Sequence, residues 1–163
     1  MKQVSTLFLK IVVILMSIPV LALCILGLPQ VAIKAFSHAA DGETLGYIIL
    51  IVLFVVYVTT IPFFMSLFQT VKLLTLIEKD QAFSQDSVKG LTKIKNHSKI
   101  ISGLYILILP LVYLVAEWDD APGLILINLI LIGASFAVAV FSSVLQRLLQ
   151  KAIDYKEEND LTI

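Results

Sequence analysis

Four long stretches without Asp, Glu, Lys or Arg constrain the fold of this chain more than any other feature. They cover residues 11–33, 44–71, 100–116 and 121–146. A helix needs about 20 apolar residues, with a range of about 17 to 25, to cross the hydrocarbon core of a bilayer. Because backbone groups cannot remain unpaired in lipid, runs of this length predict helices, and the alternating pattern of a membrane-barrel strand is absent.

The composition agrees with a protein whose main solvent is lipid. Hydrophobic residues make up 59% of the chain, and twelve Lys and Arg balance twelve Asp and Glu, which gives no support for direct nucleic-acid binding. We therefore expect an all-α fold, an integral membrane four-helix bundle formed by one domain over residues 1–163. The predicted spans are about 9–29, 45–70, 99–117 and 123–146.

The distribution of cations predicts the orientation of these spans. If the N-terminus is cytoplasmic, one cation, Lys34, lies outside, and eleven lie inside: Lys2, Lys10, Lys72, Lys79, Lys89, Lys93, Lys95, Lys99, Arg147, Lys151 and Lys156. Cytoplasmic loops carry an excess of Lys and Arg, so this bias predicts that both termini are cytoplasmic. It also places outside a loop at about 29–43 and the short acidic turn 117–122.

The polar segment 72–99 is predicted to form a cytoplasmic hairpin rather than a flexible loop. Apolar spacing continues past both neighbouring spans, and Ser84 is a suitable N-cap for a helix that starts near residue 85. Helices over about 45–79 and 85–116 would be about 52 and 48 Å long, against a core of about 30 Å. The second, third and fourth helices should therefore extend into the cytoplasm, the fourth as part of a tail over 147–163.

Three prolines and a small-residue motif suggest how the spans bend and pack. Pro19, Pro62 and Pro110 lie inside predicted helices, where each removes a backbone hydrogen bond; they form either static kinks or hinges. Gly133 and Ala137 are four residues apart, a spacing that lets helices approach closely. We expect the fourth helix to pack centrally or to form a contact in a homo-oligomer.

The spans contain no group suited to catalysis or ion coupling. Their polar side chains are uncharged and include Thr59, Thr60, Ser66, Gln69, Ser102 and Asn128. The one cysteine, Cys24, cannot form an intramolecular disulfide. We expect no enzyme activity, no catalytic residues, no cofactor and no metal site, and the lack of buried charge disfavours an ion-coupled transporter.

Several motifs identify a resemblance that covers nearly the whole chain. The runs TIPFFMSLFQTVKLLTLIEKDQAFSQDSV, LYILILPLVYLVAEWDDAPG and VLQRLLQKAIDYKEENDLTI resemble DUF2975, a bacterial family of small membrane proteins with four spans and no established activity. The resemblance implies a location in the bacterial cytoplasmic membrane. Members of this family resemble proteins encoded beside helix-turn-helix regulators, which implies a cytoplasmic regulator as a partner.

Two functional hypotheses remain open from the sequence. In the first, the protein signals to, or sequesters, a cytoplasmic transcriptional regulator through residues on the hairpin, namely Ala82, Phe83, Ser84, Val88 and Leu91. In the second, it is a small transporter or a membrane-protection protein that confers self-immunity. The first predicts changed transcription when the gene is deleted, and the second predicts changed sensitivity to a solute or toxin.

Overall fold

The computed structural model describes residues 2–162, and every regular element in that range is a helix. The elements are α1 (Lys2–Ala22), the π-helix η1 (Leu23–Gly27), α2 (Leu28–Ala40), α3 (Thr44–Glu78), α4 (Gln85–Trp118) and α5 (Gly123–Leu161). The first three follow one another without a loop and form a single column. Four helical columns long and apolar enough to span a membrane are thus present, and the predicted all-α fold is confirmed.

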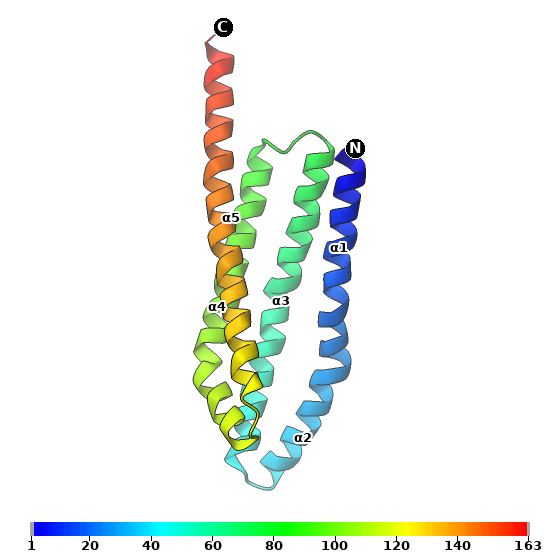
Figure 1. The fold of residues 1–163 in the computed structure, drawn as a ribbon, viewed down its shortest axis with the longest axis vertical. Coiled ribbons are helices and arrows are strands. Elements are labelled where there is room, and N and C mark those ends of the chain that lie inside the picture. The colour runs from blue at the N-terminus through cyan, green and yellow to red at the C-terminus, as the bar shows by residue number, and fades with distance from the viewer. Residues whose placement is uncertain (1, 163) are drawn as a thin grey trace.

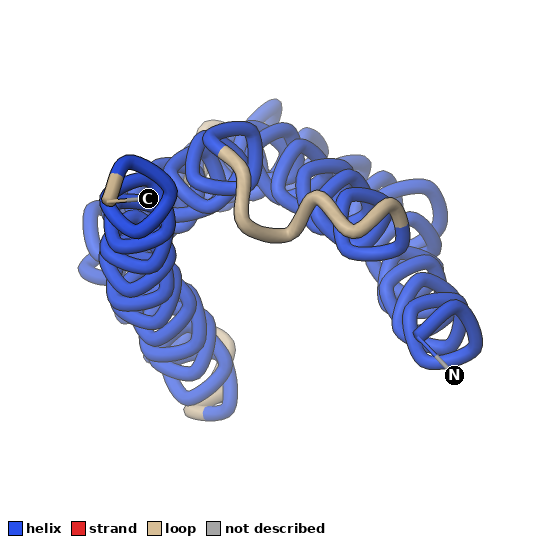
Figure 2. The backbone as a smooth tube through the Cα atoms, turned by 90° about the horizontal axis from the view of Figure 1, so that it is seen from above, coloured by secondary structure: helices blue, strands red, loops and turns tan. Residues whose placement is uncertain are grey.

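The four columns stand side by side in an arc rather than in a closed ring (Figures 1 and 2). The first column packs on α3, α3 packs on α4, and α4 packs on α5. Within residues 2–162, α1 and α5 form no comparable contact, and they stand at the two ends of the arc. Lipid solvates apolar helix faces as well as another helix does, so nothing forces an apolar bundle to close.

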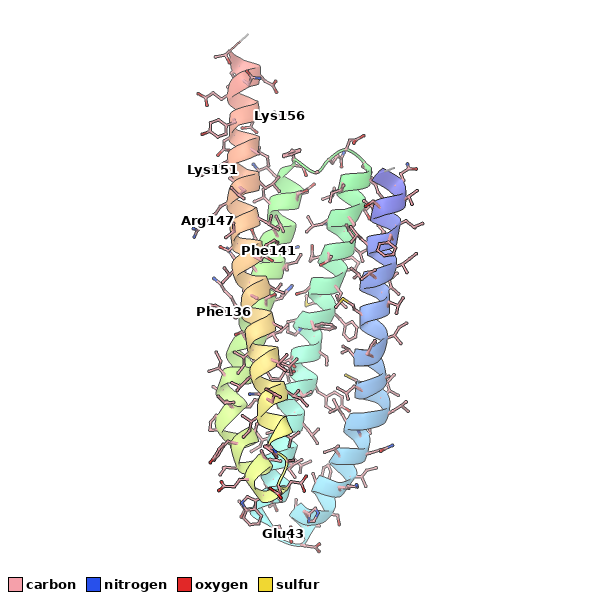
Figure 3. The ribbon with its side chains drawn as sticks, in the orientation of Figure 1. Glu43, Phe136, Phe141, Arg147, Lys151 and Lys156 are labelled. Atoms are coloured by element: carbon pink, nitrogen blue, oxygen red, sulfur yellow. The ribbon has the colours of Figure 1, made fainter. Side chains whose placement is uncertain are left out.

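The two ends of the molecule differ in charge. Both termini and the turn 79–84 lie at one end, which we call the lysine-rich end (Figure 1). Figure 3 shows Arg147, Lys151 and Lys156 following one another along α5 toward this end, with Glu43 at the opposite end. That opposite end, the acidic-turn end, holds the turns 41–43 and 119–122. The helices α3, α4 and α5 contain 35, 34 and 39 residues, more than a single crossing needs.

The helix cap predicted at Ser84 is confirmed. The Ser84 side chain accepts a hydrogen bond of 3.3 Å from the Ser87 backbone N–H at the start of α4. The preceding turn is tight, and Asp80 adopts a φ of 57° there. The cap and the turn together define where α3 ends and α4 begins.

The prediction of a loop over residues 29–43 is wrong, because most of that segment is the helix α2. Ala35 and Ala39 face α3 and are buried. Opposite them is Gly46, where an added Cβ would lie only 2.4 Å from the Ala39 nitrogen and 2.7 Å from the Ala35 oxygen. Small residues at this crossing therefore let the α2 and α3 backbones touch, and this contact supports α2 as a helix. The loop itself is limited to residues 41–43.

The expectation that the fourth helix packs centrally is also wrong. α5 lies at one end of the arc, Gly133 and Ala137 are exposed, and an added Cβ at Gly133 would meet no atom within 4 Å. The helix instead uses another face toward α4, on which Asn128, Ala139 and Ser142 are buried. A homo-oligomer contact through Gly133 and Ala137 stays a prediction.

Candidate functional site

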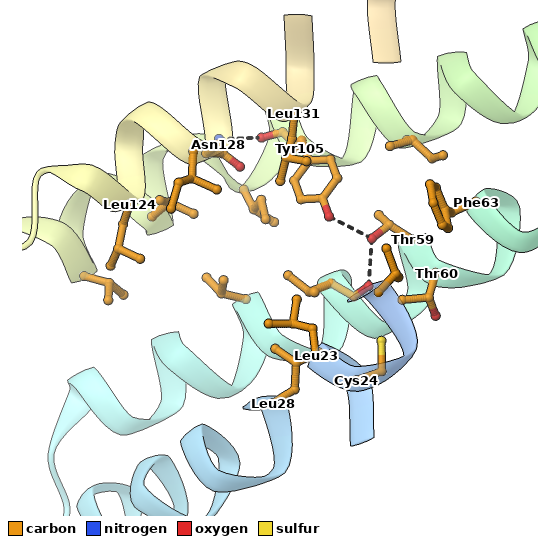
Figure 4. Close-up of a pocket in the computed structure, with 18 residues that line it drawn as sticks. Leu23, Cys24, Leu28, Thr59, Thr60, Phe63, Tyr105, Leu124, Asn128 and Leu131 are labelled. Atoms are coloured by element: carbon orange, nitrogen blue, oxygen red, sulfur yellow. Dashed lines mark hydrogen bonds between the residues drawn. The ribbon is translucent and has the colours of Figure 1, made fainter. Parts of the chain in front are cut away.

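The concave side of the arc lines an open, apolar cavity of about 410 Å³. All four columns contribute to its wall: Leu23 from η1, Val56 from α3, Ile108 from α4 and Leu131 from α5 are examples. Ligand-binding sites typically range from about 300 to 1,000 Å³, so the volume suits a small molecule or part of a lipid. Figure 4 shows the lining side chains converging from the helices on both sides.

A buried hydrogen bond joins α3 and α4 at this cavity. The Thr59 hydroxyl lies 2.7 Å from the Val56 carbonyl, to which it donates, and 3.1 Å from the Tyr105 hydroxyl. Since the Thr59 proton is directed at Val56, the Tyr105 hydroxyl is the donor of the second bond. Both side chains line the cavity (Figure 4). Tyr105 also belongs to the buried core, together with Ile108 and Val112.

Asn128 is the most polar side chain that lines the cavity. It is 4% exposed, and its Nδ2 donates to the Tyr105 main-chain carbonyl at 3.3 Å. A carbonyl can only accept, so the amide nitrogen must face Tyr105 and Oδ1 must point elsewhere. Figure 4 shows the Asn128 amide on the cavity side of α5, between Leu124 and Tyr105. Within residues 2–162, Oδ1 accepts no hydrogen bond, and it retains some accessible surface.

The π-helix η1 forms one wall of the cavity, and its irregular backbone is explained by Pro29 and by a hydrogen bond from α3. The Leu28 N–H bonds to the Leu23 carbonyl five residues back, as in a π-helix. The Cys24 carbonyl would next require a donor from residue 29, but this is Pro29, which has no N–H. The Tyr57 hydroxyl on α3 donates to the Cys24 oxygen at 2.9 Å and satisfies it. A side chain of α3 thus compensates for the irregular backbone of the first column.

The three predicted hinge prolines all lie inside helices. Pro19 is in α1, Pro62 is buried in α3, and Pro110 is in α4. Pro19 precedes η1 by four residues, and the column turns toward α3 as it continues into α2 (Figure 1). Whether these prolines act as hinges stays a prediction.

At the lysine-rich end, α1 and α3 are joined by an ion pair. Lys10 Nζ lies 2.6 Å from Glu78 Oε2, and the Thr6 hydroxyl donates to Glu78 Oε1 at 2.8 Å. The hydrogen bond from Lys10, helped by the one from Thr6, holds the pKa of the Glu78 carboxyl below its usual value. These contacts hold the start of α1 against the end of α3.

The residues predicted to bind a partner do not share one exposed surface. Phe83 is 62% exposed, whereas Ala82, Ser84 and Leu91 are half-buried. Val88 is 8% exposed, so its assignment to a partner surface is wrong. Ser87, Val88 and Gly90 are all buried, so neighbouring helices cover the first turns of α4, and on the Gly90 side Leu73 of α3 lies within about 3.1 Å of a Cβ built on the glycine.

The end of α5 is a better candidate for an accessible surface, and the sequence argument did not single it out. Ile153 is the last buried residue, and residues 154–161 are exposed throughout. We call this segment the acidic arm, because Asp154, Glu157, Glu158 and Asp160 outnumber its one cation, Lys156. The arm reaches beyond the other helices (Figure 1). Ile163, the last residue of the predicted tail, lies outside the described residues.

The cavity was missed for a different reason. Thr59 and Asn128 were noted as polar residues in the spans, but only the structure brings them together with Tyr105, from three helices. A possible signal was the spacing of Gly27 and Pro29, which predicts irregular backbone. Within the described residues, no three His, Cys, Asp or Glu side chains gather where they could hold a metal ion.

Comparison with known proteins gives two matches over nearly the full length. The family model described as "Protein of unknown function (DUF2975)" matches residues 5–163. The chain is 48% identical over 164 residues to the "Uncharacterized membrane protein YoaS" of Bacillus subtilis (strain 168), with 100% of each chain covered. No solved structure matches the chain significantly.

Proposed function

The chain belongs to the DUF2975 family and is a membrane protein, and on that premise we propose that it is a non-catalytic signalling protein that binds a cytoplasmic transcriptional regulator. The acidic arm of α5 is the proposed binding surface. This proposal includes the orientation in which the lysine-rich end faces the cytoplasm of a bacterium, which the excess of cations there supports.

The observation that carries the proposal is that α5 continues as a helix beyond its last packed residue. An isolated helix as short as the arm would be only marginally stable in water, because stability requires about 12 to 15 residues. The arm also carries two large apolar side chains, Tyr155 and Leu161, which are 70% and 87% exposed. Large apolar side chains on an exposed helix are typical of a segment that is covered when a partner binds.

The charge of the arm supports a basic partner. Anionic lipid attracts the lysines of the neighbouring helices and repels the four acids of the arm, so the arm should stand clear of the membrane. Proteins that bind DNA carry a basic surface. An acidic helix held at the membrane can compete for that surface, and the regulator would then be sequestered until the complex dissociates.

The test uses charge-neutralised variants of the full chain, expressed from its own promoter. We expect Glu157→Gln/Glu158→Gln/Asp160→Asn to reproduce most of the transcriptional change that deletion of the gene causes. The matched control, Glu117→Gln/Asp119→Asn/Asp120→Asn, neutralises as many acids at the opposite end and should leave transcription unchanged. If the arm variant transcribes like the wild type, the proposal is wrong. A deletion that changes only toxin or solute sensitivity would favour the transporter or self-immunity hypothesis.

Phe83 offers a second contact to test, since it is the large exposed side chain of the 79–84 turn. Phe83→Asp should weaken regulator binding if the partner also touches this turn. The control must lie in the same turn. Phe8→Asp is therefore unsuitable, because Phe8 lies in α1 near the membrane. Gln81→Asp, in the same turn and also exposed, introduces the same charge without removing an apolar contact. Contact between the partner and this turn therefore predicts weaker binding for Phe83→Asp than for Gln81→Asp.

A further inference from the structure

We propose that the cavity on the concave side of the arc binds one monoacyl glycerolipid, with its acyl chain along the helices and a glycerol hydroxyl donating to Asn128 Oδ1. The inference is independent of the proposed function. It rests on the length of the cavity, its access from the bilayer, and the amide oxygen of Asn128 in its wall.

The cavity is long. It follows α4 from Ile101 to Val115 and α3 from Val52 to Phe63, which at 1.5 Å per residue corresponds to roughly 20 Å. The volume of about 410 Å³ is near the lower end of the usual range for ligand sites, about 300 to 1,000 Å³, and suits one extended hydrocarbon chain.

The cavity is accessible from the side. Its wall includes Leu23 of η1 at one end of the arc and Ile127 and Leu131 of α5 at the other, and these side chains are 54%, 57% and 39% exposed. Within residues 2–162, the columns that carry them form no extensive contact with each other. A lipid can therefore enter from the surrounding bilayer without crossing a polar surface.

Asn128 selects the chemistry of the ligand. An amide in an apolar wall within a membrane span is costly unless its polar atoms are paired. Its Nδ2 donates to Tyr105, and its Oδ1, which retains some accessible surface, can accept a hydrogen bond from a ligand. A fully acylated phospholipid has no free hydroxyl on its glycerol backbone, and it has two chains for a cavity that fits one. A monoacyl glycerolipid has one chain and a free hydroxyl, so it matches both features.

The position of Asn128 also sets the direction of the ligand. Asn128 lies toward the acidic-turn end of the cavity, and Phe63 lies at the other end (Figure 4). With its hydroxyl at Asn128, the lipid would direct its head group to the nearer membrane surface at the acidic-turn end. Its chain would pass Tyr105 and Thr59 and end near Phe63.

The experiment uses the full chain in phosphatidylcholine nanodiscs and two photoreactive probes with a diazirine at the end of the chain. One probe is a long-chain monoacylglycerol, and the other is the methyl ester of the same fatty acid, which has no hydroxyl. We expect the monoacylglycerol to label the protein about five-fold more strongly at equal concentration, as one hydrogen bond allows. The labelled peptides should contain Phe63 or Ile101.

Three variants separate a binding role of Asn128 from a structural one. Asn128→Leu should label equally with both probes, whereas Ser135→Ala, on α5 outside the cavity, should keep the wild-type preference. Val56→Phe should fill the cavity and reduce labelling by both probes; if it does not fold, Leu131→Trp at the more tolerant rim tests the same point. Equal labelling of the wild type by both probes, an unchanged preference in Asn128→Leu, or labelling mapped outside the cavity would overturn the proposal.

Discussion

The Tyr57 hydroxyl donates a hydrogen bond to the main-chain oxygen of Cys24, across the interface between α3 and the π-helix η1. This bond satisfies a carbonyl for which Pro29 supplies no N–H. The same mechanism explains how the first column tolerates irregular backbone at membrane depth, where water is not available to pair the exposed oxygen.

Replacing Tyr57 should therefore destabilise the protein in a way that depends on Pro29. Tyr57→Phe is expected to cost about 1 kcal/mol, in the range measured for hydrogen bonds between membrane helices. Pro29→Ala restores an N–H at residue 29, so in that background the cost of Tyr57→Phe should become smaller. A double-mutant cycle on unfolding in mild detergent measures this coupling.

Tyr113→Phe is the matched control for this cycle, because Tyr113 is exposed on α4. It should change the unfolding free energy little in either background. Equal costs of Tyr57→Phe with and without Pro29 would show that the two residues act separately, contrary to the prediction.

A second prediction concerns the contact between α2 and α3. Gly46→Ala should destabilise the protein by about 1 to 3 kcal/mol, because the new Cβ would overlap main-chain atoms of Ala39 and Ala35, which cannot move aside without separating the helices. Gly133→Ala makes the same chemical change at a position with open space and should cost nothing. Thermal unfolding in nanodiscs compares the two, and equal midpoints would contradict the packing described for α2.

The elements that the sequence predicts well are those set by local patterns. Absence of charge over each run defines the four columns, and Ser84 defines the start of α4. α2 was missed because Lys34, Ser37 and His38 make the segment polar, although the four-residue spacing of Ala35 and Ala39 is a signal for close packing.

The cavity and the arc could not be predicted, because they depend on which faces of apolar helices meet. Hydropathy does not distinguish a helix face in lipid from one on another helix, so α5 could be expected at the centre of a bundle. The π-helix depends on a partner, Tyr57, that is 33 residues away from Cys24. Asn128 and Tyr105 likewise gain their roles only from the pairing of α4 with α5.

A third prediction concerns the ion pair between α1 and α3. The pKa of Glu78 is lowered in the folded protein, first by the hydrogen bond from Lys10 and then by that from Thr6. A carboxyl with a depressed pKa stabilises the fold above its unfolded value of 4.5, and this stabilisation is lost as the pH falls through the folded pKa. Glu78→Gln should therefore be less stable than wild type near neutral pH and should approach it under acid conditions.

Denaturant midpoints measured as a function of pH test this behaviour. Glu157→Gln is a suitable control, since Glu157 is exposed on the acidic arm and should show no such convergence. A stability difference between Glu78→Gln and wild type that stays constant from neutral pH to well below 4.5 would show that the Glu78 charge is not what stabilises the contact.

The last prediction tests which end of the molecule faces the cytoplasm. With Cys24 replaced by serine, a single new cysteine is placed either at Asp41, in the acidic-turn end, or at Gln81, in the lysine-rich end; both positions are exposed. The excess of Lys and Arg at the lysine-rich end predicts that a membrane-impermeant maleimide labels Asp41→Cys in intact cells and labels Gln81→Cys only after the membrane is opened. The reverse pattern would place the acidic arm outside the cell, where it could not bind a transcriptional regulator. Labelling of both positions after lysis is the internal control, because it shows that each cysteine can react.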